Sequence, residues 1–403
     1  MSDIIHNESG RKNQPKMGIP LMIAIGVLLA LFIYGAVWTL FAGHSVWGTT
    51  DEFSWGILIS AYVFFAVGCT GICMLSTLGH RGWILKLVFG EDRFSDMDNL
   101  EDMGIKPIVL AISFMLTAFA VLLFELMYPI NLGIYGVISP NFQSAFIWMG
   151  YLYGIYLVFL ILEVIFHVKH QEKALKAASF LAILTGIVAT SNLGAVFGTM
   201  PGRAFWTTPY LPILFIFTAL LTGAAALMVL YYFQGKRSRE EIVPYLSKLL
   251  VLFIIIVTVM TAWNMVSGVI GQYPERYEAT MYLLTGGLSV SFWVFEVGIG
   301  LFIPLAIVFI TRNPKLLLAA AVMALIGMMF ARHNLVTAGQ TVLLQPDPST
   351  PAHLLGYTPT FVELSMVIGG VGVLLALYFA ITKLLNKLEK PEPDIVKEEQ
   401  KAG

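Results

Sequence analysis

The chain has 403 residues, of which 58% are apolar and only 12% are charged, and its mean hydropathy is +0.80. A soluble domain carries roughly 25% charged residues, so this composition excludes a mainly soluble protein and indicates a surface that faces lipid. The formal net charge of −1 does not indicate a partner, because the charges are segregated along the chain. No nucleic-acid partner is expected.

Ten apolar stretches are long enough to cross ~30 Å of hydrocarbon as helices, which takes about 20 residues each. Only helices and closed barrels satisfy their backbone groups in lipid, and these stretches are too long and continuous for barrel strands. The sequence therefore predicts an all-α integral membrane protein of about ten transmembrane helices. In chain order the predicted spans cover residues 17–43, 54–76, 106–128, 143–168, 174–196, 209–233, 247–271, 284–310, 315–334 and 361–386.

The basic residues predict the orientation of these spans. Lys and Arg cluster before the first span, in every second loop and after the last span, whereas the intervening segments hold only Arg203, Arg276 and Arg332. By the positive-inside rule, we expect both termini to face the cytoplasm. We expect the protein to lie in the inner (cytoplasmic) membrane of the cell. We expect a cytoplasmic N-terminus at 1–16, a membrane domain at 17–386 and a disordered cytoplasmic tail at 387–403. A cleaved signal peptide at the first span is the alternative for that segment.

A first group of polar and aromatic residues approaches the outer third of the membrane. Ionisable side chains at membrane depth are costly and mark functional sites by default. A quinone ring needs hydrogen-bond donors for its two carbonyls and a proton acceptor or donor for its redox chemistry. Interfacial anchoring and interhelical hydrogen bonding are the alternative explanation. The candidates are Glu125 and Tyr62 as the reacting pair, with Tyr151, Ser191, Asn192, Arg203 and Trp206 around the ring.

A second group of charged residues lies away from this cluster. Glu296 is predicted near the middle of the eighth span, and Glu163 and His167 lie one turn apart near the inner end of the fourth. Such groups can form a proton path, or they can be a structural carboxylate and snorkelling side chains. Arg332, at the predicted outer end of the ninth span, either anchors that end or pairs with Glu296.

The sequence carries no signature of a bound redox centre. Haem in a helical bundle needs axial ligands such as histidine within the membrane, and none of the seven histidines lies near the middle of a predicted span. The two cysteines, Cys69 and Cys73, are too few for an iron–sulfur cluster, and there is no metal-ligand cluster. Electrons that reach a quinone here must therefore pass to or from a partner.

Several segments resemble the NrfD/PsrC family, the membrane subunits of polysulfide reductase and its relatives. The resemblance covers residues 17–386 and includes features of the ten-span branch, with its hydrogenase-2-type, sulfite-reduction-associated and alternative complex III subunits. It is carried by Val46 to Thr50, by Trp55-Gly56 with Tyr62, Phe65 and Gly68, by Glu125 to Pro129, by Ser191 to Gly194 with Trp206, by Arg332 to Asn334, and by Gly356 to Thr360 with Glu363.

The resemblance implies two four-helix bundles, at about 54–196 and 209–334, with one flanking helix at each end. It also implies a menaquinone or ubiquinone site near the outer face, to which Tyr62 and Glu125 correspond, and no haem or iron–sulfur cluster in this chain. The expected partner is a ferredoxin-type iron–sulfur subunit on that face, with a molybdopterin subunit or a multihaem cytochrome c beyond it. Proton movement through Glu163, His167 and Glu296 is a further implication.

Two other functions also fit ten spans. A secondary transporter or ion channel shares the repeated bundles, but it commonly breaks its helices near the middle of the membrane, where Pro304 stands largely alone. A cofactor-free membrane anchor for an extrinsic complex is the other alternative. Bound quinone would distinguish the first interpretation from both.

Overall fold

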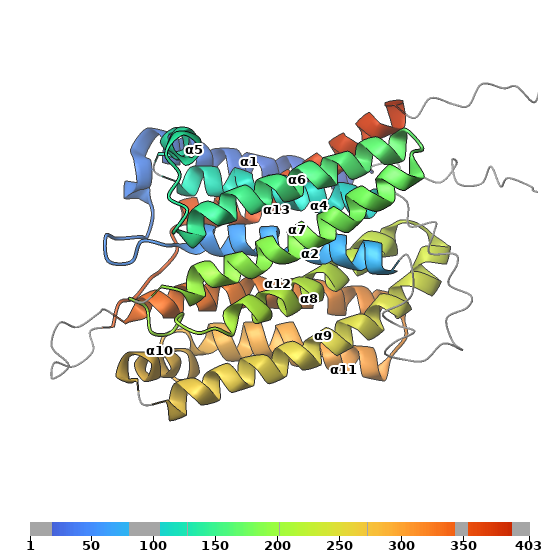
Figure 1. Ribbon diagram of the computed structural model, residues 1–403. Coiled ribbons are helices and arrows are strands. Elements are labelled where there is room, and N and C mark those ends of the chain that lie inside the picture. The colour runs from blue at the N-terminus through green and yellow to red at the C-terminus, as the bar shows by residue number, and fades with distance from the viewer. Residues whose placement is uncertain are drawn as a thin grey trace, which may run out of the picture.

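A computed structural model describes residues 18–79, 105–126, 128–200, 202–271, 273–342 and 354–388. Ten helices of this part are long and apolar enough to cross a membrane, which confirms the predicted all-α integral membrane fold. Figure 1 shows them side by side in one elongated bundle. The predicted cytoplasmic N-terminus at 1–16 and most of the tail at 387–403 lie outside the described residues.

The spanning helices follow the predicted order. They are α1 (Ile19–Ala42), α2 (Ile57–Gly79), α4 (Lys106–Glu125), α6 (Ala145–Val168), α7 (Glu172–Gly198), α8 (Leu211–Phe233), α9 (Lys236–Ile270), the π-helix η5 (Ser291–Phe302) continued by α11 (Ile303–Ile310), α12 (Pro314–Thr341) and α13 (Phe361–Leu388).

Three short helices were not predicted. A 3₁₀ turn, η2 (Gly43–Val46), follows α1, while α5 (Pro129–Ile138) follows α4 and α10 (Pro274–Leu284) follows α9. Both α5 and α10 lie at the same end of the bundle, at the left of Figure 1. We call this the α5 end; it is the end that the basic residues predict to face outward. With 10 and 11 residues, these two helices are too short to span.

Some helix ends differ from the prediction. The predicted third span ran to 128, but α4 ends at Glu125, because the chain turns before the proline that opens α5. The predicted ninth span ended at 334, but α12 continues to Thr341. Its last two turns contain Thr337, Gln340 and Thr341, which are buried in the protein. Hydropathy does not detect such a turn, because its polar side chains are satisfied inside the bundle.

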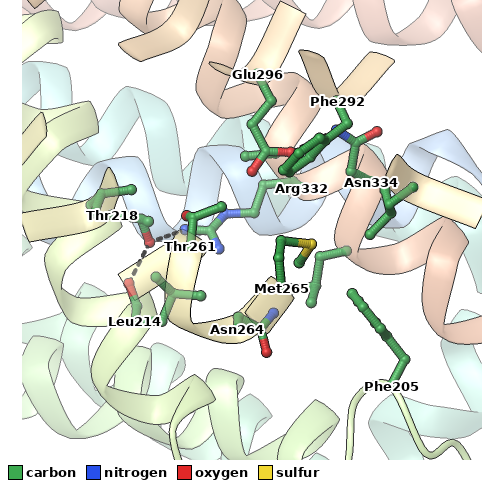
Figure 2. Close-up of a pocket in the computed structure, with 14 residues that line it drawn as sticks. Phe205, Leu214, Thr218, Thr261, Asn264, Met265, Phe292, Glu296, Arg332 and Asn334 are labelled. Carbon is green, nitrogen blue, oxygen red and sulfur yellow. Dashed lines mark hydrogen bonds between the residues drawn. The ribbon is translucent and has the colours of Figure 1, made fainter. Parts of the chain in front are cut away.

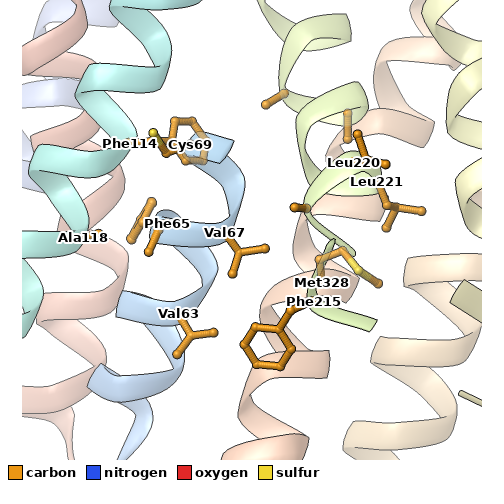
Figure 3. Close-up of a cluster of buried hydrophobic side chains, with 14 of the residues drawn as sticks. Val63, Phe65, Val67, Cys69, Phe114, Ala118, Phe215, Leu220, Leu221 and Met328 are labelled. Carbon is orange, nitrogen blue, oxygen red and sulfur yellow. The ribbon is translucent and has the colours of Figure 1, made fainter. Parts of the chain in front are cut away.

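The helix α2 lies at the centre and packs against α4, α7, α8 and α12. Its approach to α8 is very close, because a Cβ atom at Gly71 would lie 1.7 Å from the carbonyl oxygen of Ala219. Gly223 of α8 faces Gly71 in the same way. Figure 3 shows apolar side chains of α2, including Val63 and Val67, facing the side of α8 and α12. Small residues commonly allow this spacing between membrane helices.

The first and last spanning helices pair with each other. A Cβ atom at Gly369 of α13 would lie 2.4 Å from the backbone nitrogen of Phe32 in α1, so these two helices are also in close contact. The α13 helix packs in turn against α4 and α2. The C-terminal helix therefore reaches the same helices that carry Glu125 and Tyr62, and this contact positions the site described next.

Candidate functional site

Glu125 is the last residue of α4 and is 9% exposed. Its Oε2 atom is buried without a hydrogen-bond partner. The backbone of Gly56 faces this carboxyl group, and the carboxylate of Glu363 lies close enough to interact with it electrostatically. Buried polar atoms are rarely left unpaired in folded proteins, so this carboxyl is placed to meet a water molecule or a ligand.

Glu363, in the first turn of α13, is fully buried and hydrogen-bonded on both oxygens. Oε2 accepts from the N–H groups of Gly48 and Thr360, both at 2.8 Å, and from the Thr360 hydroxyl at 3.1 Å. Oε1 accepts from the Tyr357 hydroxyl at 2.5 Å. Burial, followed by the charge of Glu363, raises the pKa of the Tyr357 hydroxyl, which therefore stays a donor. This pair joins α13 to the segment before α2.

Residues 47–57 run from the end of η2 to the first residue of α2, and several groups hold this segment at the α5 end of the bundle. The Tyr357 hydroxyl accepts from the N–H of Ile57 at 2.8 Å. The Gln340 side chain bonds both backbone groups of Trp55, accepting at 2.9 Å and donating at 2.8 Å. The guanidinium group of Arg203 donates to the carbonyl oxygens of Gln340 and Glu52 at 3.3 and 3.2 Å.

Trp206 also packs against the segment 47–57. It is 2% exposed, donates to the carbonyl oxygen of Leu335 at 2.7 Å, and stacks on Trp55 with ring centroids 5.3 Å apart. Arg203 and Trp206, both predicted to surround a quinone ring, are therefore engaged in holding the segment 47–57 against α12. The structure connects them to the Glu125 region through this segment.

Tyr62 lies deeper than Glu125. It is 3% exposed on α2 and near enough to Tyr153 of α6 for the two phenols to interact electrostatically. The Tyr153 hydroxyl is 3.4 Å from the Thr190 hydroxyl, which donates to that of Thr70 at 2.8 Å. Tyr62 thus borders a buried group of hydroxyls between α2, α6 and α7. Sequence reasoning missed Tyr153, although its spacing from Tyr156 on one face of α6 was a visible signal.

Tyr151, Ser191 and Asn192 also lie at the α5 end. No hydrogen bond described for them reaches Glu125 or Tyr62. The Tyr151 hydroxyl donates to the carbonyl oxygen of Gly136 at 2.5 Å and joins α6 to α5. The Asn192 side chain donates to the carbonyl oxygen of Ala145 at 2.9 Å and joins α7 to the start of α6. Ser191 is half-buried on α7. The contacts of Tyr151 and Asn192 are those of residues that hold helices together.

A cavity of about 40 Å³ lies among α8, α9, α10, η5 and α12, with room for a few water molecules. Figure 2 shows Arg332 extending across it between Glu296 and Thr218. Glu296 accepts from the amide of Asn334 at 2.6 Å, while Arg332 donates to Thr218 and lies over the ring of Phe215 at 4.3 Å. The other lining residues include Asn264, Thr261, Met265, Phe292 and Phe205.

Arg332 is not at the end of its helix. It is 3% exposed and lies nine residues before Thr341, the end of α12. Its position therefore excludes the anchoring alternative, and the guanidinium group instead shares a cavity with Glu296. Glu125 and Tyr62 do not line this cavity.

Glu163 lies at the opposite end of the bundle from Glu125, on the buried face of α6. It is 1% exposed and accepts a hydrogen bond from Ser179 of α7, and its Oε2 atom is buried without a partner. His167 is half-buried one turn further along α6. Glu163 thus lies between α6 and α7, whereas Glu296 lies between η5 and α12 at a different depth.

The fold and these sites define a class of protein. It is a multi-pass helical membrane protein with buried carboxyl groups at both ends and within the bundle, namely Glu125, Glu163, Glu296 and Glu363. Comparison with known proteins gives the family: residues 45–344 match the family model NrfD, described as polysulphide reductase, NrfD. The chain belongs to the NrfD family.

Curated relatives carry related names. A selenate reductase subunit of Mesobacillus selenatarsenatis is 22% identical, over 93% of this chain and 96% of its own length. A polysulfide reductase subunit of Wolinella succinogenes is 25% identical, over 74% of this chain and 99% of its own length. An Hdr-like menaquinol oxidoreductase integral membrane subunit of Archaeoglobus fulgidus is 25% identical, over 64% of this chain and 69% of its own length.

Proposed function

We propose that this chain is the quinone-reactive membrane subunit of a multisubunit respiratory oxidoreductase of the cytoplasmic membrane. The observation that carries the proposal is the buried Glu125 carboxyl at the α5 end, which has one oxygen without a partner. The names of the relatives support it, since one is a menaquinol oxidoreductase subunit and two are subunits of reductases.

The substrate would be menaquinone or ubiquinone, whose quinol gives up two electrons and two protons when it is oxidised. Glu125 would bond one ring oxygen and accept or donate its proton, because one of its oxygens is buried without a partner at the end of α4. Tyr62, deeper on α2, would bond the ring at its inner side. Tyr151, Ser191, Asn192, Arg203 and Trp206 remain predicted neighbours, of which Arg203 and Trp206 act through the segment 47–57.

The two electrons would pass to or from a ferredoxin-type iron–sulfur subunit docked at the α5 end, with a molybdopterin subunit or a multihaem cytochrome c as the further partner. This placement follows from the position of Glu125 at that end. Both termini would then lie in the cytoplasm.

Proton movement is a second part of the proposal. Glu163 with His167 would exchange protons at the inner end, and Glu296 would do so in the cavity beside Arg332. On the buried face of α6, Tyr156 and Tyr153 follow Glu163 toward the α5 end, with Leu160 between Glu163 and Tyr156. Hydroxyl groups in such a row can pass protons with the help of bound water.

The first experiment replaces Glu125 by Gln in the purified complex and measures quinol-linked turnover. Because general acid–base catalysis contributes about 10²–10⁴-fold, we expect turnover to fall by about 100-fold or more while the complex still assembles. Glu172→Gln, an exposed carboxylate at the start of α7, is the control and should leave turnover unchanged. Unchanged turnover in Glu125→Gln would remove this residue from the site.

Organic extraction of the purified wild-type protein tests the wider proposal. We expect about one quinone per protein molecule, as menaquinone or ubiquinone. A transporter, an ion channel or a cofactor-free anchor would hold none, so absence of quinone together with insensitivity to quinol analogues would contradict the proposal.

A further inference from the structure

The helix α13 lies beyond the region that matches the family model, which ends at residue 344. It nevertheless supplies a buried carboxylate beside Glu125. Glu363 bonds the N–H of Gly48, more than 300 residues earlier in the chain, and Tyr357 bonds that of Ile57. Two segments far apart in the chain, at 48–57 and 357–363, therefore meet beside the carboxyl group that carries the proposed function.

The two carboxyl groups differ in their hydrogen bonds. Glu363 receives four, from Gly48, from both groups of Thr360 and from Tyr357, and the bonds with Thr360 form a capping box at the start of α13. Glu125 has a buried oxygen without a partner. The Glu363 carboxylate is therefore held in place by hydrogen bonds within the protein, whereas Glu125 has an oxygen that can bond a ligand.

Gly56 lies between these carboxyl groups without room for a side chain. A Cβ atom there would be 2.7 Å from Oε1 of Glu363 and 2.8 Å from the Tyr357 hydroxyl, and the backbone of Gly56 faces Glu125. A Cβ atom at Gly48 would be 2.2 Å from the carbonyl oxygen of Thr358. The backbone of 48–57 is thus pressed directly against α13 and the residues before it.

The aromatic contacts make this arrangement rigid. The ring of Tyr357 stacks on that of Phe53 at 4.9 Å, with an angle of 6° between the planes. Phe53 itself is 1% exposed and lies in the same segment as Gly56. Tyr357 therefore holds the segment both through its ring and through its hydroxyl group.

We propose that the C-terminal helix completes the quinone head-group site, and that Glu363 and Tyr357 are its positioning residues. They hold the backbone of 48–57 against Glu125, so that a ring oxygen meets the free carboxyl oxygen at a fixed place. The inference rests on the proposed function. Small displacements at such a site matter, because a shift of about 1 Å can cost about 10²-fold in rate.

The test measures binding of heptyl-hydroxyquinoline N-oxide, a fluorescent quinol analogue, to the purified full-length protein in its complex. Titration gives the Kd and the number of sites separately. Tyr357→Phe removes one hydroxyl and keeps the stacked ring, and Glu363→Gln removes the charge and two of the acceptor positions. We expect Kd to rise by about tenfold in each variant, with the number of sites unchanged.

Tyr378→Phe is the matched control, because Tyr378 lies on α13 well away from this end, and it should bind the probe as the wild type does. A purely structural role would reduce the number of sites at constant Kd, and that result would overturn the inference. Wild-type binding in both variants, with loss of binding in Glu125→Gln, would overturn it while leaving the proposed function intact. Absence of probe binding in the wild type would instead refute the proposed function itself.

Discussion

Glu296 and Arg332 show how individual charges are kept inside this membrane protein. Each is less than 9% exposed, and each has a neutral partner, Asn334 for the carboxylate and Thr218 for the guanidinium group. They face the same cavity, where water can mediate between them. Burying a charge costs desolvation free energy, which the attraction to a nearby opposite charge offsets. A buried charge that loses its counter-charge is costly because this attraction is lost.

Replacing Arg332 by Leu should therefore destabilise the protein by about 3 kcal/mol, since Glu296 would remain in the cavity without its cation. The measurement is thermal unfolding in one detergent, followed by intrinsic fluorescence. The double variant Arg332→Leu, Glu296→Gln should recover part of the loss. Arg312→Leu, at an exposed position between α11 and α12, should change stability by no more than about 0.5 kcal/mol. Equal stability of Arg332→Leu and wild type would show that the two charges do not depend on each other.

The sequence predicted the burial of single charged residues better than it predicted which residues contact them. That Glu125, Glu163 and Glu296 are buried within the bundle was predictable, because a carboxylate within an apolar stretch is conspicuous. The depth of Arg332 was not, because its neighbours His333 and Asn334 resemble the end of a span, whereas they lie inside the packed helix α12. The bond between Glu363 and Gly48 joins residues 315 positions apart in the chain, and no local pattern encodes it.

At the scale of the helix, the prediction succeeded where hydropathy is the deciding property. All ten spans were found because each has at least 20 residues. The helices α5 and α10 were missed since they are too short for a spanning window. The π-helix η5, which contains Glu296, was also not predictable. It is followed by Pro304, whose missing N–H removes one helical hydrogen bond. Its wider turns are frequent at functional sites, and periodicity does not reveal them.

The contact between α2 and α8 gives a prediction at the same scale. Gly71→Leu should prevent these helices from meeting, because even a Cβ atom would lie 1.7 Å from a backbone oxygen of α8. We expect little monodisperse protein in size-exclusion chromatography after detergent extraction. Gly154→Leu on α6 is the matched control, since nothing lies within 4 Å of its Cβ position, and it should elute as the wild type does. Normal elution of Gly71→Leu would mean that α2 and α8 are not in close contact.

For the whole molecule, the arrangement of charge along the chain implies one orientation in the membrane. The turn with Lys169, the start of α9 with Lys236 and the turn with Arg312 all lie opposite the α5 end, because consecutive spanning helices alternate in direction. Basic residues remain on the cytoplasmic side during insertion. The α5 end, with Glu125 and the segment 47–57, would consequently face outward, where the iron–sulfur partner is proposed to dock.

Cysteine labelling tests this orientation with little background, because Cys69 and Cys73 are both buried within α2. In intact cells, a membrane-impermeant maleimide should label Asn141→Cys, an exposed position between α5 and α6, and should leave Lys169→Cys unlabelled. After the cells are broken, both variants should react. The reverse pattern in intact cells would place Glu125 near the cytoplasm. The proposed partner would then have to dock on the cytoplasmic side, and any protons released at Glu125 would enter the cytoplasm instead of leaving the cell.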